Sequence, residues 1–406
     1  RDRSVSRGLG DVYKRQEQLI GKHPRIEAVD ALRGFAVMAI LLVHNLEHFI
    51  FPVYPADSPG WLNALDQGVF NVVFTLFAGK AYAIFALLFG FTFYIQSDNL
   101  KRRGGDFGYR FLWRLVLLAG FATLNAAFFP AGDVLLLFVV AGLVLFFTRN
   151  WGDGAILAAA VVFLLQPVEW YHCIAALLNP AHRLPDLGVG EMYARVAEYT
   201  KAGNFGDFIL GNVTLGQKAS LLWAVNAGRF VQTAGLFLLG FYIGRKQLFA
   251  ATEKNLRFWV KTLIVSAIAF APLYTLRELV TDNGAVVGQT AGTALDMWQK
   301  LAFTLVLVAS FILLYQRRKF SAAVAGLRFY GRMSLTNYIT QSIVGSMLYY
   351  NWGFALHNQF GITASCLAGI VFFILQFSFC RWWMNHHSHG PMEYISVSYT
   401  HLRAHE

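Results

Sequence analysis

Charged residues are scarce in this chain. Asp, Glu, Lys and Arg make up 14% of its 406 residues, whereas an average soluble domain has about 25%. Hydrophobic residues make up 56% and aromatic residues 16%. So little charge on so apolar a chain argues against an ordinary soluble domain.

Cysteine is scarce as well. The three cysteines, Cys173, Cys366 and Cys380, show no pairing pattern, which excludes a disulfide framework and predicts buried free thiols. The formal net charge is +11. Because membrane proteins concentrate Lys and Arg in their cytoplasmic loops, this excess does not indicate a nucleic-acid partner.

Long apolar stretches are abundant, among them "VLLLFVVAGLVLFF" and "LAFTLVLVASFILLY". Many windows of about 17 to 25 residues carry almost no charge, which is the length of a helix that crosses a bilayer. The sequence therefore predicts an all-α, polytopic integral membrane helical bundle in a lipid bilayer. About ten transmembrane helices are expected, at 31–50, 80–97, 111–129, 133–148, 153–172, 221–244, 258–278, 297–316, 333–352 and 361–384.

The distribution of basic residues predicts the orientation. With both termini inside, Lys101, Arg102 and Arg103 lie in a cytoplasmic loop, and the short outer loops contain no Lys or Arg. This is the asymmetry that the positive-inside rule requires. We therefore expect an N-in, C-in protein of the bacterial cytoplasmic (inner) membrane, with the segment 62–79 interfacial or re-entrant rather than an eleventh span.

Both ends of the chain resemble translated sequencing-adaptor read-through. We expect 1–16 and 396–406 to be non-native, which leaves 17–395 as a single transmembrane domain that inserts without them. Its longest outer loop is expected at about 173–220. Within this loop "EMYARVAEYT" has the pattern of an amphipathic helix, and the length of the loop suggests a lid or a substrate-facing role.

The stretch "HNLEH" contains the His-x-x-Glu-His pattern of a group of zinc peptidases. His44 and His48 are i, i+4 neighbours on a helix, so both imidazoles could reach one metal ion. The motif is short, however, and it ends an apolar span rather than belonging to a soluble scaffold. We therefore expect no metal site here, and we expect Glu47 and His48 at the solvated end of the helix.

His44 is harder to explain as interfacial polarity. It follows Arg33 by eleven residues, or about 16 Å along a helix. If Arg33 is near the inner boundary, His44 lies past the middle of a hydrocarbon core about 30 Å thick. An ionisable side chain at that depth usually faces a polar cavity or a partner, so His44 is a candidate functional residue.

Several blocks resemble one family, the YeiB-like bacterial membrane proteins, whose defining domain is domain of unknown function 418. The resemblance covers about 25–395 and is carried by "RIEAVDALRGFAVMAILLVHN", "GKAYAIFALLFGFTFYI", "FLLGFYIGRKQLF", "YGRMSLTNYITQSIVGSMLYYNWG" and "HGPMEYI". It implies a distant similarity to type-3 membrane acyltransferases and to heparan-α-glucosaminide N-acetyltransferase. Arg33 and His44 have the spacing of the basic residue and histidine of the type-3 enzymes, whereas most YeiB-like proteins have Asn at the position of His44. Asn125, before "GDVL", stands where the family tends to have His.

The similarity implies a set of catalytic residues. Acyl transfer to a hydroxyl or amine needs a base and donors for the oxyanion. His44 is the candidate base, and Glu47 is a candidate to orient it. Asn337 and Gln341, on one helix face, are candidate substrate or oxyanion donors, and the alternative is that they join helices by hydrogen bonds.

A second set of residues would bind the two substrates. Arg33, Arg110 and Arg114 are candidates for the phosphates of a CoA donor, although Arg33 could simply pair with Asp30. Lys80 and Asp133 are candidates to contact the other substrate or each other. "HHSH" at 386–389 is expected at the cytoplasmic edge rather than around a metal.

These observations support an acyltransferase that uses acetyl-CoA or another acyl-CoA as co-substrate, with no tightly bound cofactor. Its acceptor would be an extracytoplasmic glycan or a lipid-linked molecule. The alternative is a transporter for a small solute or lipid, because buried Asn, Gln, His and Glu could line a pathway. The sequence does not indicate the oligomeric state.

Overall fold

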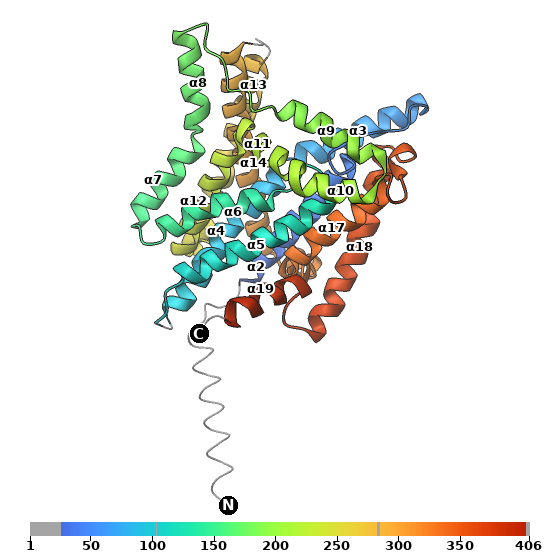
Figure 1. The fold of residues 1–406 in the computed structure, drawn as a ribbon. Helices are drawn as coiled ribbons and strands as arrows, with labels where there is room; N and C mark the ends of the chain where they lie inside the picture. Colours follow the sequence, from blue (N-terminus) through green and yellow to red (C-terminus); the bar gives the residue numbers. More distant parts are fainter. Residues whose placement is uncertain (1–25, 103, 282–284, 403–406) are drawn as a thin grey trace, which may run out of the picture.

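A computed structural model describes residues 26–102, 104–281 and 285–402 (Figure 1). Throughout these ranges the regular secondary structure is helical and contains no strand. Several of the helices are long and apolar enough to cross a bilayer. The predicted class, a polytopic membrane helical bundle, is confirmed.

Each expected span corresponds to a helix or a pair of helices. The matching elements are α2 (Glu27–Leu46), α4 (Lys80–Lys101), α5 (Gly108–Phe128), α6 (Leu135–Thr148), α7 (Asp153–Leu164) with α8 (Pro167–Leu178), α12 (Arg229–Arg245), α13 (Glu253–Thr281), α14 (Val286–Tyr315), α17 (Ser334–Tyr349) and α18 (Ile362–His386).

The expected number of ten spans is higher than helix length supports. Six helical segments of the described chain are long and apolar enough to cross a membrane, or seven if α7 and α8, bent by 47°, form one broken span. The helices α6, α12 and α17 have only 14, 17 and 16 residues. The spans expected at 133–148, 221–244 and 333–352 extend beyond these helices, and the first residues of the second one belong to α11 (Gln217–Asn226).

Helix α2 lies at the centre of the bundle, and glycines allow the closest helix crossings around it. A Cβ atom on Gly34 would lie 2.2 Å from the Leu327 carbonyl oxygen, so α2 packs directly against the backbone of α16 (Leu327–Arg332). Helices α4 and α12 cross in the same way, because a Cβ on Gly240 would lie 1.9 Å from the Leu87 oxygen. Small residues of this kind let membrane helices approach closely.

Most of the segment 173–220 is helical rather than irregular. It contains α9 (Val189–Ala202), α10 (Phe205–Gly211), a π-helix (Asn212–Gly216) and the start of α11 (Gln217–Asn226). The stretch "EMYARVAEYT" lies in α9, as its pattern predicts. These short helices, drawn in green, lie below the tops of α8 and α13 in Figure 1.

The segment 62–79 forms most of α3 (Gly60–Phe77), a peripheral helix that meets α4 at a break around Gly79. The last described helix, α19 (Pro391–Leu402), extends into the segment 396–406. Residues 1–16 lie outside the described part of the chain, so the expectation that both ends are non-native stays a prediction.

One end of the bundle collects the basic residues and is called the basic end below. There Arg245 and Lys246, at the end of α12, form ion pairs with Asp153 at the start of α7. Arg328 pairs with Glu27 at the start of α2. By the positive-inside rule, the basic end would be cytoplasmic.

Candidate functional site

Two cavities open toward opposite ends of the bundle and share one lining residue, Tyr338. The inner cavity, on the side of the basic end, has a volume of about 360 Å³ and is lined by Arg33, Thr92, Arg114, Arg332, Glu393 and Tyr338, among others. The outer cavity has a volume of about 590 Å³, and its lining includes His44, Glu47, Lys80, Asp133, Arg229 and Tyr338. The predicted donor-binding and catalytic residues therefore lie in different cavities.

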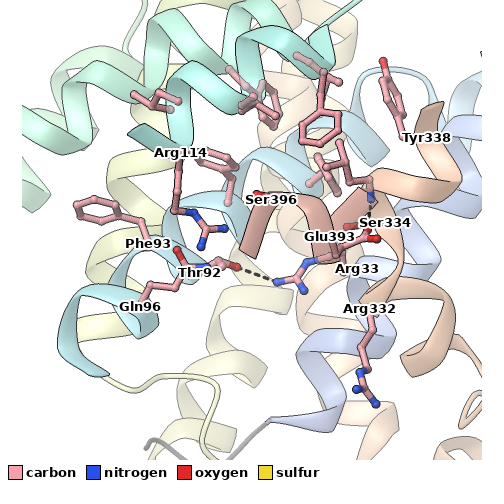
Figure 2. Close-up of a pocket in the computed structure, with 18 of the residues that line it drawn as sticks. Arg33, Thr92, Phe93, Gln96, Arg114, Arg332, Ser334, Tyr338, Glu393 and Ser396 are labelled. Atoms are coloured by element: carbon pink, nitrogen blue, oxygen red, sulfur yellow. Dashed lines mark hydrogen bonds between the residues drawn. The ribbon is translucent and has the colours of Figure 1, made fainter. Parts of the chain in front are cut away.

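Arginine and aromatic side chains form much of the inner cavity (Figure 2). Arg114 on α5 and Arg33 on α2 both project into it. Arg33 donates a 2.8 Å hydrogen bond to the Thr92 hydroxyl and forms the predicted local ion pair with Asp30, at 3.3 Å. These contacts fix the direction of the Arg33 guanidinium while it still faces the cavity.

Helix α19 covers part of the inner cavity and is anchored by Glu393. The Glu393 carboxylate accepts hydrogen bonds from the backbone N–H of Leu335, at 2.8 Å, and from the Thr336 hydroxyl, at 2.6 Å. It thereby caps the N-terminus of α17, where a negative charge is favourable. Arg332 extends away from the other two arginines (Figure 2) and donates to the Ser388 carbonyl oxygen.

Arg110 does not belong with the other predicted donor-binding residues. It lies one turn before Arg114 on α5 and lines neither the inner nor the outer cavity. Arg114 follows Arg110 by four residues, but only Arg114 lines the inner cavity. Arg110 is therefore a natural control for experiments on Arg114.

His44 and Glu47 lie at the end of α2 and both face the outer cavity. The half-buried His44 ring packs against Phe129, with ring centroids 4.7 Å apart, and lies 6.4 Å from the ring of Tyr338. No hydrogen bond between His44 and Glu47 is found in the described chain. The imidazole nitrogens therefore remain open to a ligand in the cavity.

His48 faces the protein interior instead of the solvated end of a helix. Its side chain is fully buried, with Nε2 2.6 Å from the Ser365 hydroxyl and Nδ1 2.9 Å from the Val53 carbonyl oxygen. The expected interfacial position of His48 is therefore wrong, because the chain turns back after α2. Across the described ranges, no group of three or more His, Cys, Asp and Glu side chains is placed to hold a metal ion.

Two carboxyl groups in the connections outside the helical spans border the outer cavity. Burial raises the pKa of Glu47 to about 7, and the nearby Arg229 charge opposes this rise. Burial also raises the pKa of Asp133 to about 6, against hydrogen bonds from the Leu135 and Leu136 N–H groups and from Asn125. Both acids are thus close to a change of charge near neutral pH.

The two predicted substrate contacts, Lys80 and Asp133, share the outer cavity, but their own polar contacts go elsewhere. Asp133 accepts a 2.8 Å hydrogen bond from the Asn125 amide, whose oxygen accepts from Ser342. The Lys80 ammonium lies 3.5 Å from the Phe74 carbonyl oxygen. Asn125, which departs from the family pattern, therefore acts as the support for Asp133.

Asn337 and Gln341 line neither cavity. Gln341 donates to the Tyr330 hydroxyl, at 2.9 Å, and to the Gln376 oxygen, at 3.2 Å, which joins α17 to α16 and α18. Asn337 donates to the Tyr330 carbonyl oxygen. This arrangement is the interhelical hydrogen bonding that the sequence left open as the alternative to substrate binding.

Sequence reasoning missed three residues of the site: Tyr338, Arg229 and Glu393. Tyr338 and Glu393 stand in the blocks "LTNYITQS" and "GPMEYI", which carry the family resemblance, so those blocks were an available signal. Arg229 had no such signal. It follows Gly228, whose φ of 65° turns the chain into α12, and only the folded structure brings it beside His44 and Glu47.

Residues 243–403 match the family model described as "Protein of unknown function (DUF418)". The chain is also 24% identical over 410 residues to an uncharacterized protein of Bacillus subtilis (strain 168), YxaH, covering 93% of this chain and 94% of that relative. It is 23% identical over 382 residues to an uncharacterized 39.9 kDa protein encoded in the amylase 3′ region of Bacillus acidopullulyticus, covering 91% and 92%.

Proposed function

Because the description of the DUF418 family, whose model matches residues 243–403, names no activity, we propose the function of this chain from the two cavities. The protein is a multi-pass acyltransferase of the bacterial inner membrane. It takes an acyl group from acyl-CoA in the inner cavity and transfers it to a hydroxyl or amine of an extracytoplasmic or lipid-linked acceptor in the outer cavity. The observation that supports this proposal is that Tyr338, beside His44, lines both cavities.

The inner cavity has the chemistry that acyl-CoA requires. Arg33 and Arg114 would bind phosphate groups, for which guanidinium is well suited. Aromatic side chains, including Phe85, Phe89 and Phe138, line the part toward Tyr338. About 360 Å³ is near the lower limit for a small-molecule pocket, so it would hold the acylated arm while the nucleotide lies at the mouth.

The transfer step would take place between His44 and Tyr338. A ring nitrogen of neutral His44 accepts the proton of the acceptor O–H or N–H as the acceptor atom bonds to the thioester carbon. The carbon–sulfur bond then breaks, and the CoA thiolate leaves with the proton that His44 gives back. Tyr338, which lines both cavities, would donate from its hydroxyl to the carbonyl oxygen as negative charge develops there.

A transporter would also use two cavities separated by a closed segment. The difference in chemistry between the two cavities favours acyl transfer. Both cavities contain arginine and aromatic side chains, but the outer one also contains two lysines, Lys80 and Lys300, and two aspartates, Asp133 and Asp296. A solute that crossed the protein unchanged would meet similar groups on both sides, while two different substrates require two different sites.

The test is acetyl-CoA binding to the purified full chain in detergent, measured by calorimetry. We expect micromolar binding that is lost in Arg33→Ala and Arg114→Ala and retained in Arg110→Ala, the matched control on the same helix. Absence of binding to the native chain would overturn the proposal and favour transport. Equal loss in Arg110→Ala would show that general charge, and not the inner cavity, holds the ligand.

A further inference from the structure

Four cationic side chains border one part of the outer cavity: Lys80, Arg229, Arg277 and Lys300. They come from α4, α12, α13 and α14, so only the folded chain brings them together. A second cavity, of about 500 Å³, shares three of them, Arg229, Arg277 and Lys300, and is lined mainly by residues of α13 and α14. The cationic cluster therefore borders both this cavity and the outer cavity, which His44 also lines.

Gly79 lets two of these cations approach each other. Its φ of 76° suits glycine, and a Cβ atom there would lie 3.0 Å from the Lys300 Cδ and 3.5 Å from the Arg229 Nη2. A side chain at this position would occupy the space beside both groups. Like charges held this close in a half-buried site repel each other, and a shared anion would lower this electrostatic repulsion.

Arg229 is held by aromatic rings rather than by acids. Its guanidinium carbon lies 5.2 Å from the ring centre of Tyr82 and 5.0 Å from that of Trp223. Across the described residues its guanidinium forms no hydrogen bond or ion pair. Stacking on rings fixes the plane of a guanidinium and leaves its N–H groups available for a ligand.

The acidic side chains of the outer cavity do not balance the cluster. Asp296 forms ion pairs with Lys300 and, at 3.6 Å, with Arg277. Asp133 is engaged with Asn125 and with backbone N–H groups. Glu47 is the remaining acid of this cavity. Burial raises its pKa to about 7, so it is only partly ionised near neutral pH. Lys80 and Arg229 thus leave a local positive charge without a fixed counterion.

We infer that Arg229 and Lys80 bind a phosphate-type oxyanion carried by the molecule in the outer cavity, which on the proposed function is the acyl acceptor. Arg229 would contact two phosphate oxygens through its N–H groups, and Lys80 would act as a point charge. The acceptor is then a phosphorylated compound, either a soluble phosphomonoester or the phosphate of a lipid headgroup. Its hydroxyl or amine would lie toward His44.

The experiment uses the full chain in nanodiscs of zwitterionic phosphatidylcholine. In one arm glycerol 3-phosphate is titrated by calorimetry, with uncharged glycerol as the control ligand. In the other arm increasing fractions of phosphatidic acid are built into the discs, and the rise in thermal unfolding temperature is measured. The variants are Arg229→Gln, Arg229→Lys and Lys80→Gln, with Arg257→Gln, at an exposed pair with Glu253, as the matched control.

We expect saturable binding in at least one arm, weakened about tenfold or more by Arg229→Gln and Lys80→Gln, because a charge-assisted contact is lost. Arg229→Lys should bind with intermediate affinity, and Arg257→Gln like the native chain. Binding of glycerol 3-phosphate indicates a soluble acceptor, and binding of phosphatidic acid alone indicates a lipid one. If Arg229→Gln does not fold, Lys80→Gln and Arg229→Lys carry the same test.

No binding in either arm, or equal binding by all variants, would overturn the inference. Because CoA also carries phosphates, Arg114→Ala is titrated in parallel and should bind glycerol 3-phosphate normally. A loss in Arg114→Ala would place the phosphate in the inner cavity and likewise overturn the inference. Acetyl-CoA binding is measured in the same nanodiscs to separate this inference from the proposed function. If acetyl-CoA binds and neither phosphate ligand does, the inference fails and the proposed function stands.

Discussion

The rings of His44 and Tyr338 lie 6.4 Å apart, centre to centre, and Tyr338 lines both the inner and the outer cavity. His44 comes from the end of α2 and Tyr338 from the first turns of α17. On the proposed function, this pair would place a candidate base and a candidate oxyanion donor on either side of one reacting bond.

His44→Gln should abolish acyl transfer without removing acyl-CoA binding. Loss of a general base typically lowers the rate by a factor of about 10² to 10⁴, while the Arg33 and Arg114 contacts remain. The measurement is the release of free CoA thiol from acetyl-CoA in membrane vesicles that carry the protein and their native acceptors. His386→Gln, exposed at the end of α18, is the control, and a fully active His44→Gln would remove His44 as the base.

Glu393 should make the stability of the protein depend on pH. Burial raises the pKa of its carboxyl above the ordinary value of 4.5. A raised folded-state pKa means that its contribution to stability is complete below pH 4.5 and decreases as the pH rises through the folded-state value. Relative to Glu393→Gln, which does not titrate, the native chain should therefore lose thermal stability as the pH is raised from about 4 to 8.

Thermal unfolding in detergent at several pH values checks this prediction for Glu393. Glu198→Gln, at an exposed position of α9, should show no such relative change. If the native chain instead gained stability over Glu393→Gln with rising pH, the hydrogen bonds from Leu335 and Thr336 to the carboxylate would outweigh its burial.

The helices were predictable from the sequence because a segment that crosses lipid must be long, apolar and able to form all its backbone hydrogen bonds internally. The positions of α2, α4, α5 and α18 follow directly from this requirement. Their number did not follow, because α6 and α17 are short and α7 and α8 are bent against each other. Apolarity alone does not distinguish a loop that packs inside the bundle from the end of a span.

The candidate site was predictable only in part. The eleven-residue spacing of Arg33 and His44 predicted two candidate positions on one helix, and each lines a cavity, but the spacing did not show that the two cavities are different. Arg110 and Arg114 looked equivalent in sequence, but they lie one turn apart along α5, and only Arg114 lines the inner cavity. Arg229 meets His44 and Glu47 only through the packing of α12 against α4, which no local pattern encodes.

Gln341→Leu should affect folding rather than substrate binding. The substitution removes the hydrogen bonds to Tyr330 and Gln376, and interhelical bonds of this kind contribute about 0.6 to 1.7 kcal/mol in membranes. We expect a lower unfolding temperature with acetyl-CoA affinity unchanged. Thr123→Val, which removes an exposed hydroxyl bonded within α5, is the control. A loss of ligand affinity at unchanged stability would restore Gln341 as a substrate contact.

Gly240→Ala should destabilise the bundle strongly for so small a change. The added methyl group would lie 1.9 Å from the Leu87 oxygen and 3.0 Å from the Phe91 nitrogen, so α4 and α12 would have to separate at a cost of roughly 1 to 3 kcal/mol. Gly120→Ala is the matched control, because nothing lies within 4 Å of a Cβ there. Replacing that glycine in an exposed part of α5 should leave stability unchanged or raise it by about 0.5 to 1 kcal/mol. Thermal unfolding of both variants measures the difference, and equal stabilities would mean that the α4–α12 crossing is looser than the structure indicates.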